Sequence, residues 1–170
     1  MILLLESYKQ IFKNKQFSGK LIISGQLKGN YHYSTRQFIR FHQLENEIIL
    51  TGFISDEEKS YCYQHALVFV YPSLYEGFGM PILEAMISGT PVLCSNAASI
   101  PEVGGDACLY FDPHNADDIY SKLLLLINDS SKRKEMAVKG KIQSGKFDWQ
   151  TTAIETLKVY KEMSNSKNGM

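Results

Sequence analysis

The sequence predicts an α/β domain of the Rossmann-like kind, a three-layer α/β/α arrangement with a mostly parallel sheet. Short apolar runs of strand length alternate with longer segments of helical periodicity along the 170 residues, and this alternation is typical of a parallel sheet covered on both faces. The apolar runs are continuous, as in strands buried on both sides. A chain of this length is expected to form one domain with its own core.

The order of the elements follows from local patterns. The chain opens on an amphipathic helix, residues 2–14, whereas doubly wound domains usually open on a strand. Ser55 and Glu58 form a capping box that starts a helix, and Asp148 can cap the last one. Strands are expected at residues 21–25, 48–53, 66–71, 91–94 and 108–111, and later helices at residues 81–88, 116–128, 131–145 and 149–163. Residues 1–163 thus make up the domain, and residues 164–170 form a polar tail.

Composition excludes several classes of function. Lys and Arg number 18, as do Asp and Glu, and a chain without excess positive charge is a poor match for nucleic acid. The three cysteines and four histidines lack metal-ligand spacing, so buried free thiols are expected rather than a metal site or a disulfide. The apolar start, residues 1–5, is too short to span a membrane and does not have the pattern of a signal peptide. We expect a cytoplasmic protein.

The stretch with the most functional signals is YPSLYEGFGMPILEAMISGTPV, residues 71–92. Its loop, residues 73–80, follows a predicted strand, and ligands of such sheets bind beyond the carboxyl ends of the strands. Gly77 and Gly79 let the backbone approach a bound group. The helix that begins near Pro81 offers free N–H groups, and its dipole is worth roughly 0.3–1 kcal/mol to an anion. The loop therefore predicts a phosphate site.

Two acids, Glu76 and Glu84, stand with seven residues between them around this loop. Carboxylates repel phosphate, but they accept hydrogen bonds from hydroxyls, each worth on the order of 1.5–3 kcal/mol. A ligand with hydroxyl groups on both sides of its phosphates, one set for each acid, is a sugar nucleotide. The alternative is that both acids are solvated residues near a helix start, where they favour the helix dipole.

Glu-Gly-Phe-Gly-Met-Pro-Ile-Leu-Glu-Ala-Met, followed by Ser-Gly-Thr-Pro-Val, resembles the signature of the group 1 glycosyltransferases, family 4. The similarity extends to TGFISDEEKSYCYQHALVFVYPSLYEGFG, to SNAASIPEVGGDACLYFDPHNADDI and to the closing FDWQTTAIETLKVYKEM, so it covers nearly the whole chain. It implies the GT-B fold, which has two Rossmann-like domains with the active site between them. The chain would then be the C-terminal, donor-binding domain of a retaining glycosyltransferase.

The resemblance also implies a role for individual residues. Glu76 matches the catalytic acid near the hydroxyls and reaction centre of the donor sugar, and Glu84 matches the acid that binds the ribose hydroxyls. Gly77, Phe78 and Gly79 match the loop whose amides approach the sugar and the diphosphate. Further donor contacts are expected from the turn that reads the base edge and from two residues that line the same crevice, namely Gly52, Phe53, Ile54, Ser73 and Gly25.

Family members transfer the sugar with retention and as a rule need no metal, and this sequence has no Asp-x-Asp to hold one. We therefore expect no cofactor beyond the nucleoside diphosphate sugar, which is the donor substrate. The departing diphosphate helps to deprotonate the acceptor, so stabilising that leaving group would be the main catalytic contribution of this domain.

The sequence departs from the family pattern at its start. The first strand of the domain and the Arg or Lys pair on the diphosphate have no counterpart, and neither has the N-terminal acceptor-binding domain. The isolated chain is therefore expected to be inactive, and a non-catalytic nucleotide-sugar-binding module is the alternative function. A missing inner strand would leave backbone groups unpaired, so another segment or a second copy of the chain would fill the gap.

Rival functions fit less well. A dinucleotide oxidoreductase would need Gly-x-Gly-x-x-Gly after its first strand, and a glycoside hydrolase built on the two glutamates would leave the glycine loop without an anion. Lys132, Arg133 and Lys134 are compatible with association at the inner membrane face, as in many family members, but a solvated helix face explains them more simply. Trp149 is expected to anchor the packing of the last helix.

Overall fold

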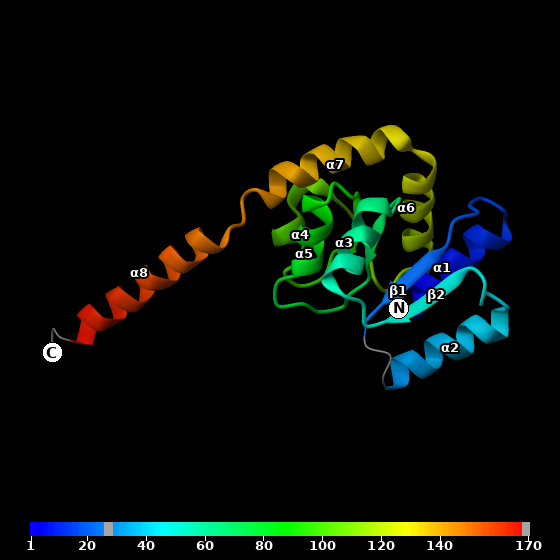
Figure 1. The fold of residues 1–170 in the computed structure, drawn as a ribbon, viewed down its shortest axis with the longest axis horizontal. Coiled ribbons are helices and arrows are strands. Elements are labelled where there is room, and N and C mark those ends of the chain that lie inside the picture. The colour runs from blue at the N-terminus through cyan, green and yellow to red at the C-terminus, as the bar shows by residue number, and fades with distance from the viewer. Residues whose placement is uncertain (26–28, 168–170) are drawn as a thin grey trace.

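The computed structural model of this chain describes residues 1–25 and 29–167, and it is a mixed α/β structure whose strands all pair in parallel (Figure 1). The strands are β1 (Leu21–Ser24), β2 (Ile48–Gly52), β3 (Phe69–Tyr71), β4 (Val92–Ser95) and β5 (Cys108–Phe111). The helices are α1 (Ile2–Lys13), α2 (Asn30–His42), α3 (Asp56–His65), α4 (Met80–Ile87), α5 (Ile100–Gly104), α6 (Ala116–Asn128), α7 (Ser130–Ser144) and α8 (Trp149–Lys167), with a 3₁₀ turn, η1, at Gly105–Ala107.

Side chains at the helix starts explain where several helices begin. The predicted capping box of α3 is complete, because the Ser55 side chain accepts from the Glu58 N–H and the Glu58 side chain accepts from the Ser55 N–H. The Asn115 side chain accepts from the first turn of α6. The predicted cap of α8 is also confirmed, since Asp148 Oδ1 accepts from the Thr151 N–H at 2.8 Å. These caps satisfy N–H groups that have no partner inside the helix.

Within the described residues the sheet is in two pieces rather than one. β1 pairs with β2, and β3, β4 and β5 pair in that order. α1 packs against both pieces, because Leu4 belongs to a core cluster with Leu93 and Phe111, whereas Leu5 belongs to one with Ile48. The two pieces therefore lie beside each other beneath α1, and β1 and β3 each have one unpaired edge. That a first strand belongs in this gap stays a prediction.

The two pieces of sheet differ in how they are covered. One face of β3–β5 packs on α1 and α6, and the other packs on α3, α4 and α5. The β1–β2 pair is covered by α1 and α2 on one face, while Ile22 and Ile49 on the other are 50% and 39% exposed. The expectation of helices on both faces thus holds for the larger piece only.

Three local predictions need correction. The strand expected at residues 66–71 begins at Phe69, because its partner β4 begins only at Val92, opposite Phe69, and pairing starts with the bond from the Phe69 N–H to the Pro91 carbonyl. The last helix does not stop at residue 163 but continues to Lys167, so it takes up part of the expected tail. Trp149 is not a packing anchor, since it is 76% exposed.

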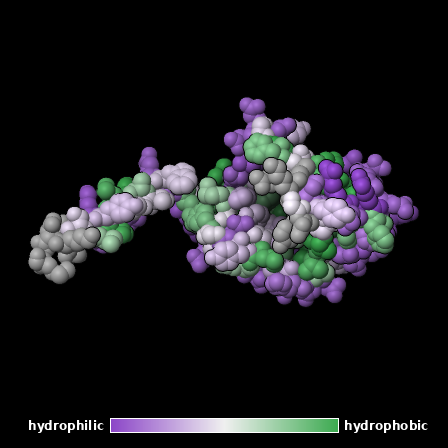
Figure 2. Space-filling model, turned by 90° about the horizontal axis from the view of Figure 1, so that it is seen from below, coloured by the Kyte–Doolittle hydropathy of each residue, from purple (hydrophilic) through white to green (hydrophobic). Residues whose placement is uncertain are grey.

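The exposure of Trp149 follows from the position of α8, which extends away from the rest of the fold (Figure 1). Figure 2 shows the same helix standing clear of the body, with hydrophobic and hydrophilic residues along it. The cysteines are free, as expected, although only Cys94 is fully buried and Cys62 and Cys108 are partly buried.

Candidate functional site

The start of α4 is a helix tip that follows a buried glycine and has no side-chain cap. Gly79 is the N-cap with φ +105°, a conformation that side chains other than glycine rarely adopt, and a Cβ there would lie 3.3 Å from Ile82 Cδ1. Gly79 has no side chain with which to cap the helix, so the first N–H groups of α4 lack a side-chain acceptor. The helix begins at Met80, one residue before the predicted start at Pro81. An uncapped helix start of this kind is what the anion site predicted from the sequence requires, and the anion site itself stays a prediction.

Glu76 lies in the loop before this tip and is partly buried. The Ser73 hydroxyl donates to Glu76 Oε1 at 2.7 Å. Burial, followed by a hydrogen bond with Glu76, raises the pKa of Tyr71 well above its ordinary value, so Tyr71 keeps its proton and remains a donor. The Ser73 hydroxyl thus holds the Glu76 carboxylate, and the protonated Tyr71 hydroxyl is close enough for Glu76 to affect its pKa.

The backbone of the loop is fixed from β4 and α5. The Ser95 hydroxyl donates to the Ser73 carbonyl at 2.5 Å, and the Ser99 hydroxyl donates to the Glu76 carbonyl at 2.9 Å. The Phe78 ring packs edge-on against Phe147, with 5.7 Å between ring centroids. The glycine loop is therefore held in one shape before any ligand arrives, which lowers the entropic cost of binding.

Glu84 lies on α4 and is held from α3. Lys59 Nζ is 3.1 Å from Glu84 Oε1, and the Tyr63 hydroxyl donates to Glu84 Oε2 at 3.1 Å. Lys59 is also 3.2 Å from Asp56. The hydrogen bond with Glu84 is the main cause that raises the pKa of Lys59, and burial is the main cause that raises the pKa of Tyr63. Both partners therefore remain protonated donors at neutral pH.

The turn predicted to read the base, Gly52 to Ile54, joins β2 to α3. The Gly25 N–H donates to the Gly52 carbonyl at 2.9 Å, so these two predicted residues are neighbours at the ends of β1 and β2. Phe53 is 92% exposed. The turn enters α3 about one helical turn before Lys59, the residue that contacts Glu84. α3 thus connects the predicted base-reading turn with the predicted ribose-binding acid.

The structure therefore gathers the predicted residues into two groups. The first is the loop from Ser73 to Gly79 with Glu76, and the second is Glu84 with the turn at the start of α3. Sequence reasoning missed the residues that fix these groups, namely Lys59, Tyr63, Tyr71, Ser95 and Ser99. The only feature of the sequence that could have identified them is their position relative to the predicted elements. Tyr71 and Ser95 are the last residues of strands, and Lys59 comes directly after the capping box.

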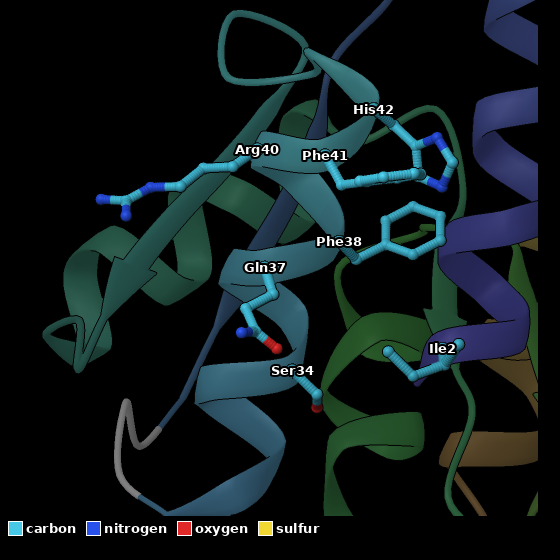
Figure 3. A pocket seen from close by; sticks show the side chains of 7 residues that line it. All are labelled: Ile2, Ser34, Gln37, Phe38, Arg40, Phe41 and His42. Atoms are coloured by element: carbon cyan, nitrogen blue, oxygen red, sulfur yellow. The ribbon is translucent and has the colours of Figure 1, made fainter.

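A separate groove lies between α1 and α2, with a volume of about 570 Å³. Figure 3 shows the rings of Phe38, Phe41 and His42 gathered toward Ile2 of α1, whereas Arg40 points the other way. The lining residues are Ile2, Ser34, Gln37, Phe38, Arg40, Phe41 and His42. None of the residues predicted for the site lines this groove, so it is a different surface.

Two further features bear on function. Among residues 1–25 and 29–167, no group of three or more His, Cys, Asp or Glu side chains is arranged to hold a metal ion. Within the same residues, every helix is too short or too polar to cross a bilayer.

The parallel α/β fold, with a glycine loop at the carboxyl end of one strand, is that of one half of a GT-B glycosyltransferase. It is similar to the structure of HepE from Anabaena in complex with UDP and glucose, with a TM-score of 0.80 and 23% sequence identity. The match covers 94% of this chain and 44% of the HepE chain. It is also similar to the C-terminal domain of LpcC, a group 1 glycosyltransferase from Francisella tularensis, with a TM-score of 0.62 and 25% sequence identity. That match covers 81% of this chain and 91% of the LpcC domain.

The sequence places the chain in a family. A sequence model of the family described as "Glycosyl transferases group 1" matches residues 1–143, so the chain belongs to that family. It is 39% identical over 158 residues to the O-antigen chain mannosyltransferase B of Escherichia coli, a match that covers 93% of this chain and 41% of that protein. The chain spans less than half the length of the curated relatives it matches.

Proposed function

We propose that the chain is the donor-binding part of a retaining glycosyltransferase, which transfers a hexose from a nucleoside diphosphate sugar to a glycan, lipid or small acceptor. The observation that carries this proposal is that Glu76 precedes the uncapped start of α4, Glu84 follows it, and each is held by partners within the fold. Mannose is the first candidate sugar, because the relative from Escherichia coli is a mannosyltransferase.

Each group in the site has a part in this proposal. The α4 tip and the amides from Gly77 to Gly79 receive the diphosphate, and the helix dipole favours the negative charge that grows on it as the glycosidic bond breaks. Glu84 accepts from the ribose hydroxyls, and Glu76 accepts from sugar hydroxyls near the reaction centre. The turn that follows β2 contacts the base through its backbone. The sequence has no Asp-x-Asp, so we expect the donor to bind without a metal.

The acceptor site is proposed to lie on a second domain outside this chain, as the GT-B fold requires. A second candidate function is a module that binds a nucleotide sugar without turnover. One observation favours it for the isolated chain: Lys59, the cation beside Glu84, is already engaged by two carboxylates and is not free to neutralise a diphosphate.

A chimaera separates the two functions. The matched segment of the Escherichia coli mannosyltransferase would be replaced by this chain, and transfer of mannose from its nucleoside diphosphate would be measured together with donor affinity. We expect transfer, and we expect Glu76→Gln to abolish it while leaving nucleotide affinity unchanged. Donor binding without any transfer would favour the binding module, and no donor binding at all would overturn both functions.

A further inference from the structure

The Glu84 carboxylate has a defined set of free acceptor sites. A carboxylate has about four lone-pair sites on its two oxygens. Lys59 Nζ occupies one on Oε1 and the Tyr63 hydroxyl occupies one on Oε2, both at 3.1 Å. Each oxygen therefore retains an acceptor site, and the Glu84 side chain is 32% exposed, so these sites are reachable from solvent. Two acceptors on one carboxylate match two neighbouring hydroxyls of a ribose.

The two donors are themselves held in place. Tyr63 is 9% exposed and its ring packs edge-on against Phe69, with 5.1 Å between centroids. The Thr90 hydroxyl donates to the Tyr63 carbonyl, which fixes the end of α3 against the turn before β4. Asp56 holds Lys59 from the other side at 3.2 Å. The carboxylate thus has its rotamer set by a rigid hydroxyl and by an ammonium group that is shared with a second acid.

We propose that Lys59 and Tyr63 are positioning residues that orient Glu84 so that it accepts from both ribose hydroxyls of the donor nucleotide. The inference rests on the proposed function, because it assigns a task to the nucleotide half of that same site. A purely structural role is the alternative. An ion pair that is about one-third exposed contributes little to stability. Stability therefore does not account for the contact between Lys59 and Glu84, whereas orientation of the carboxylate does.

The test compares affinities of the full chain for UDP and GDP with those for their 2′,3′-dideoxy analogues, by calorimetry. We expect the wild type to prefer the ribose form by at least about tenfold, the loss that accompanies one charge-assisted hydrogen bond. Glu84→Gln is expected to remove most of this preference. Lys59→Met and Tyr63→Phe are each expected to lower it by about threefold or more, through the ribose form alone, because the carboxylate is then less well oriented.

Two control variants isolate the effect. Lys59→Arg keeps a cation beside Glu84 and is expected to retain most of the preference. Lys139→Met removes a comparable ion pair on α7, 2.6 Å from Glu135, and is expected to leave the preference unchanged. Thermal melts of each variant show whether it is folded, and Tyr63→Phe removes only a hydroxyl.

Two results would overturn the inference, and they are distinguishable. If Lys59→Met and Tyr63→Phe weaken the ribose and dideoxy forms by the same factor, these residues do not orient Glu84, while the proposed function stands. If the wild type binds neither UDP nor GDP, the proposed function fails and the inference fails with it.

Discussion

Replacing Gly79 with alanine is expected to destabilise the fold by about 1–3 kcal/mol, the cost of holding a non-glycine residue in a sparsely populated backbone region. Gly79 has φ +105°, and its added Cβ would lie 3.3 Å from Ile82 Cδ1, which is buried and has little room to move. For a domain of this size, that loss lowers the melting temperature by about 2–12 °C. Urea denaturation followed by circular dichroism measures the free energy of unfolding directly.

Gly77→Ala is the matched control. A Cβ at Gly77 would meet nothing within 4 Å and its φ is not positive, so the free energy of unfolding should change by less than about 0.5 kcal/mol. Gly77 belongs to the loop that we assign to the donor, so an added methyl group there should lower affinity for a nucleoside diphosphate sugar. Equal destabilisation by the two variants would refute the argument, because it would show that Gly77 is constrained by the fold rather than by a ligand.

Three further predictions follow from the same structure. Thr90→Val removes the donor to the Tyr63 carbonyl and should lower the free energy of unfolding, measured by urea denaturation, by about 1–3 kcal/mol. Thr152→Val, at an exposed site on α8, should change it little, and an equal loss in the two variants would contradict this prediction. The side-chain hydrogen bond with Thr151 lowers the pKa of Asp148, so the stability that this cap gives to α8 is present above the ordinary pKa of 3.8 and is lost as the pH falls through and below that value. Far-UV circular dichroism should show a smaller acid-induced loss of helix in Asp148→Ala than in the wild type. Identical pH profiles for the two proteins would rule the cap out. Chelation with EDTA should leave donor affinity unchanged, because the sequence has no Asp-x-Asp, and a loss of binding would reveal a metal requirement.

Local signals predicted most of the fold. The Ser55 and Glu58 box and the Asp148 cap depend on residues that are near each other in the chain, and both are present as expected. The break between β1 and β3 agrees with the missing inner strand that the family resemblance led us to expect, but the pattern alone does not reveal it, because a buried strand has the same sequence signature whether or not it has a neighbour on each side. The same limitation explains the late start of β3, which depends on where its partner β4 begins.

The exposed α8 was also beyond prediction. Its apolar residues, among them Trp149 and Tyr160, have the pattern of a packed helix, yet both are largely exposed because no other described element lies against them. Which surface an apolar face meets is a property of the whole fold and its partners, not of the segment.

At the candidate site, the sequence predicted the acids and glycines but not their supports. Glu76 and Glu84 are conspicuous because charged residues are unusual between buried strands. Lys59 and Tyr63 act across the space between two helices, and nothing in their spacing from Glu84 along the chain reveals the contact. Ser99 likewise reaches the Glu76 carbonyl from the N-cap of α5, a helix that the sequence analysis did not expect.

An NMR titration of the full chain with nucleoside diphosphate hexoses tests the donor pocket most directly. With amide resonances assigned, the account predicts that the largest shifts fall on Gly77, Phe78, Gly79 and Met80, with a second group at the turn after β2. Glu84→Gln should weaken the titration without unfolding the protein. Shifts confined to the groove between α1 and α2, or none at millimolar ligand, would contradict the assignment of the α4 tip to the diphosphate.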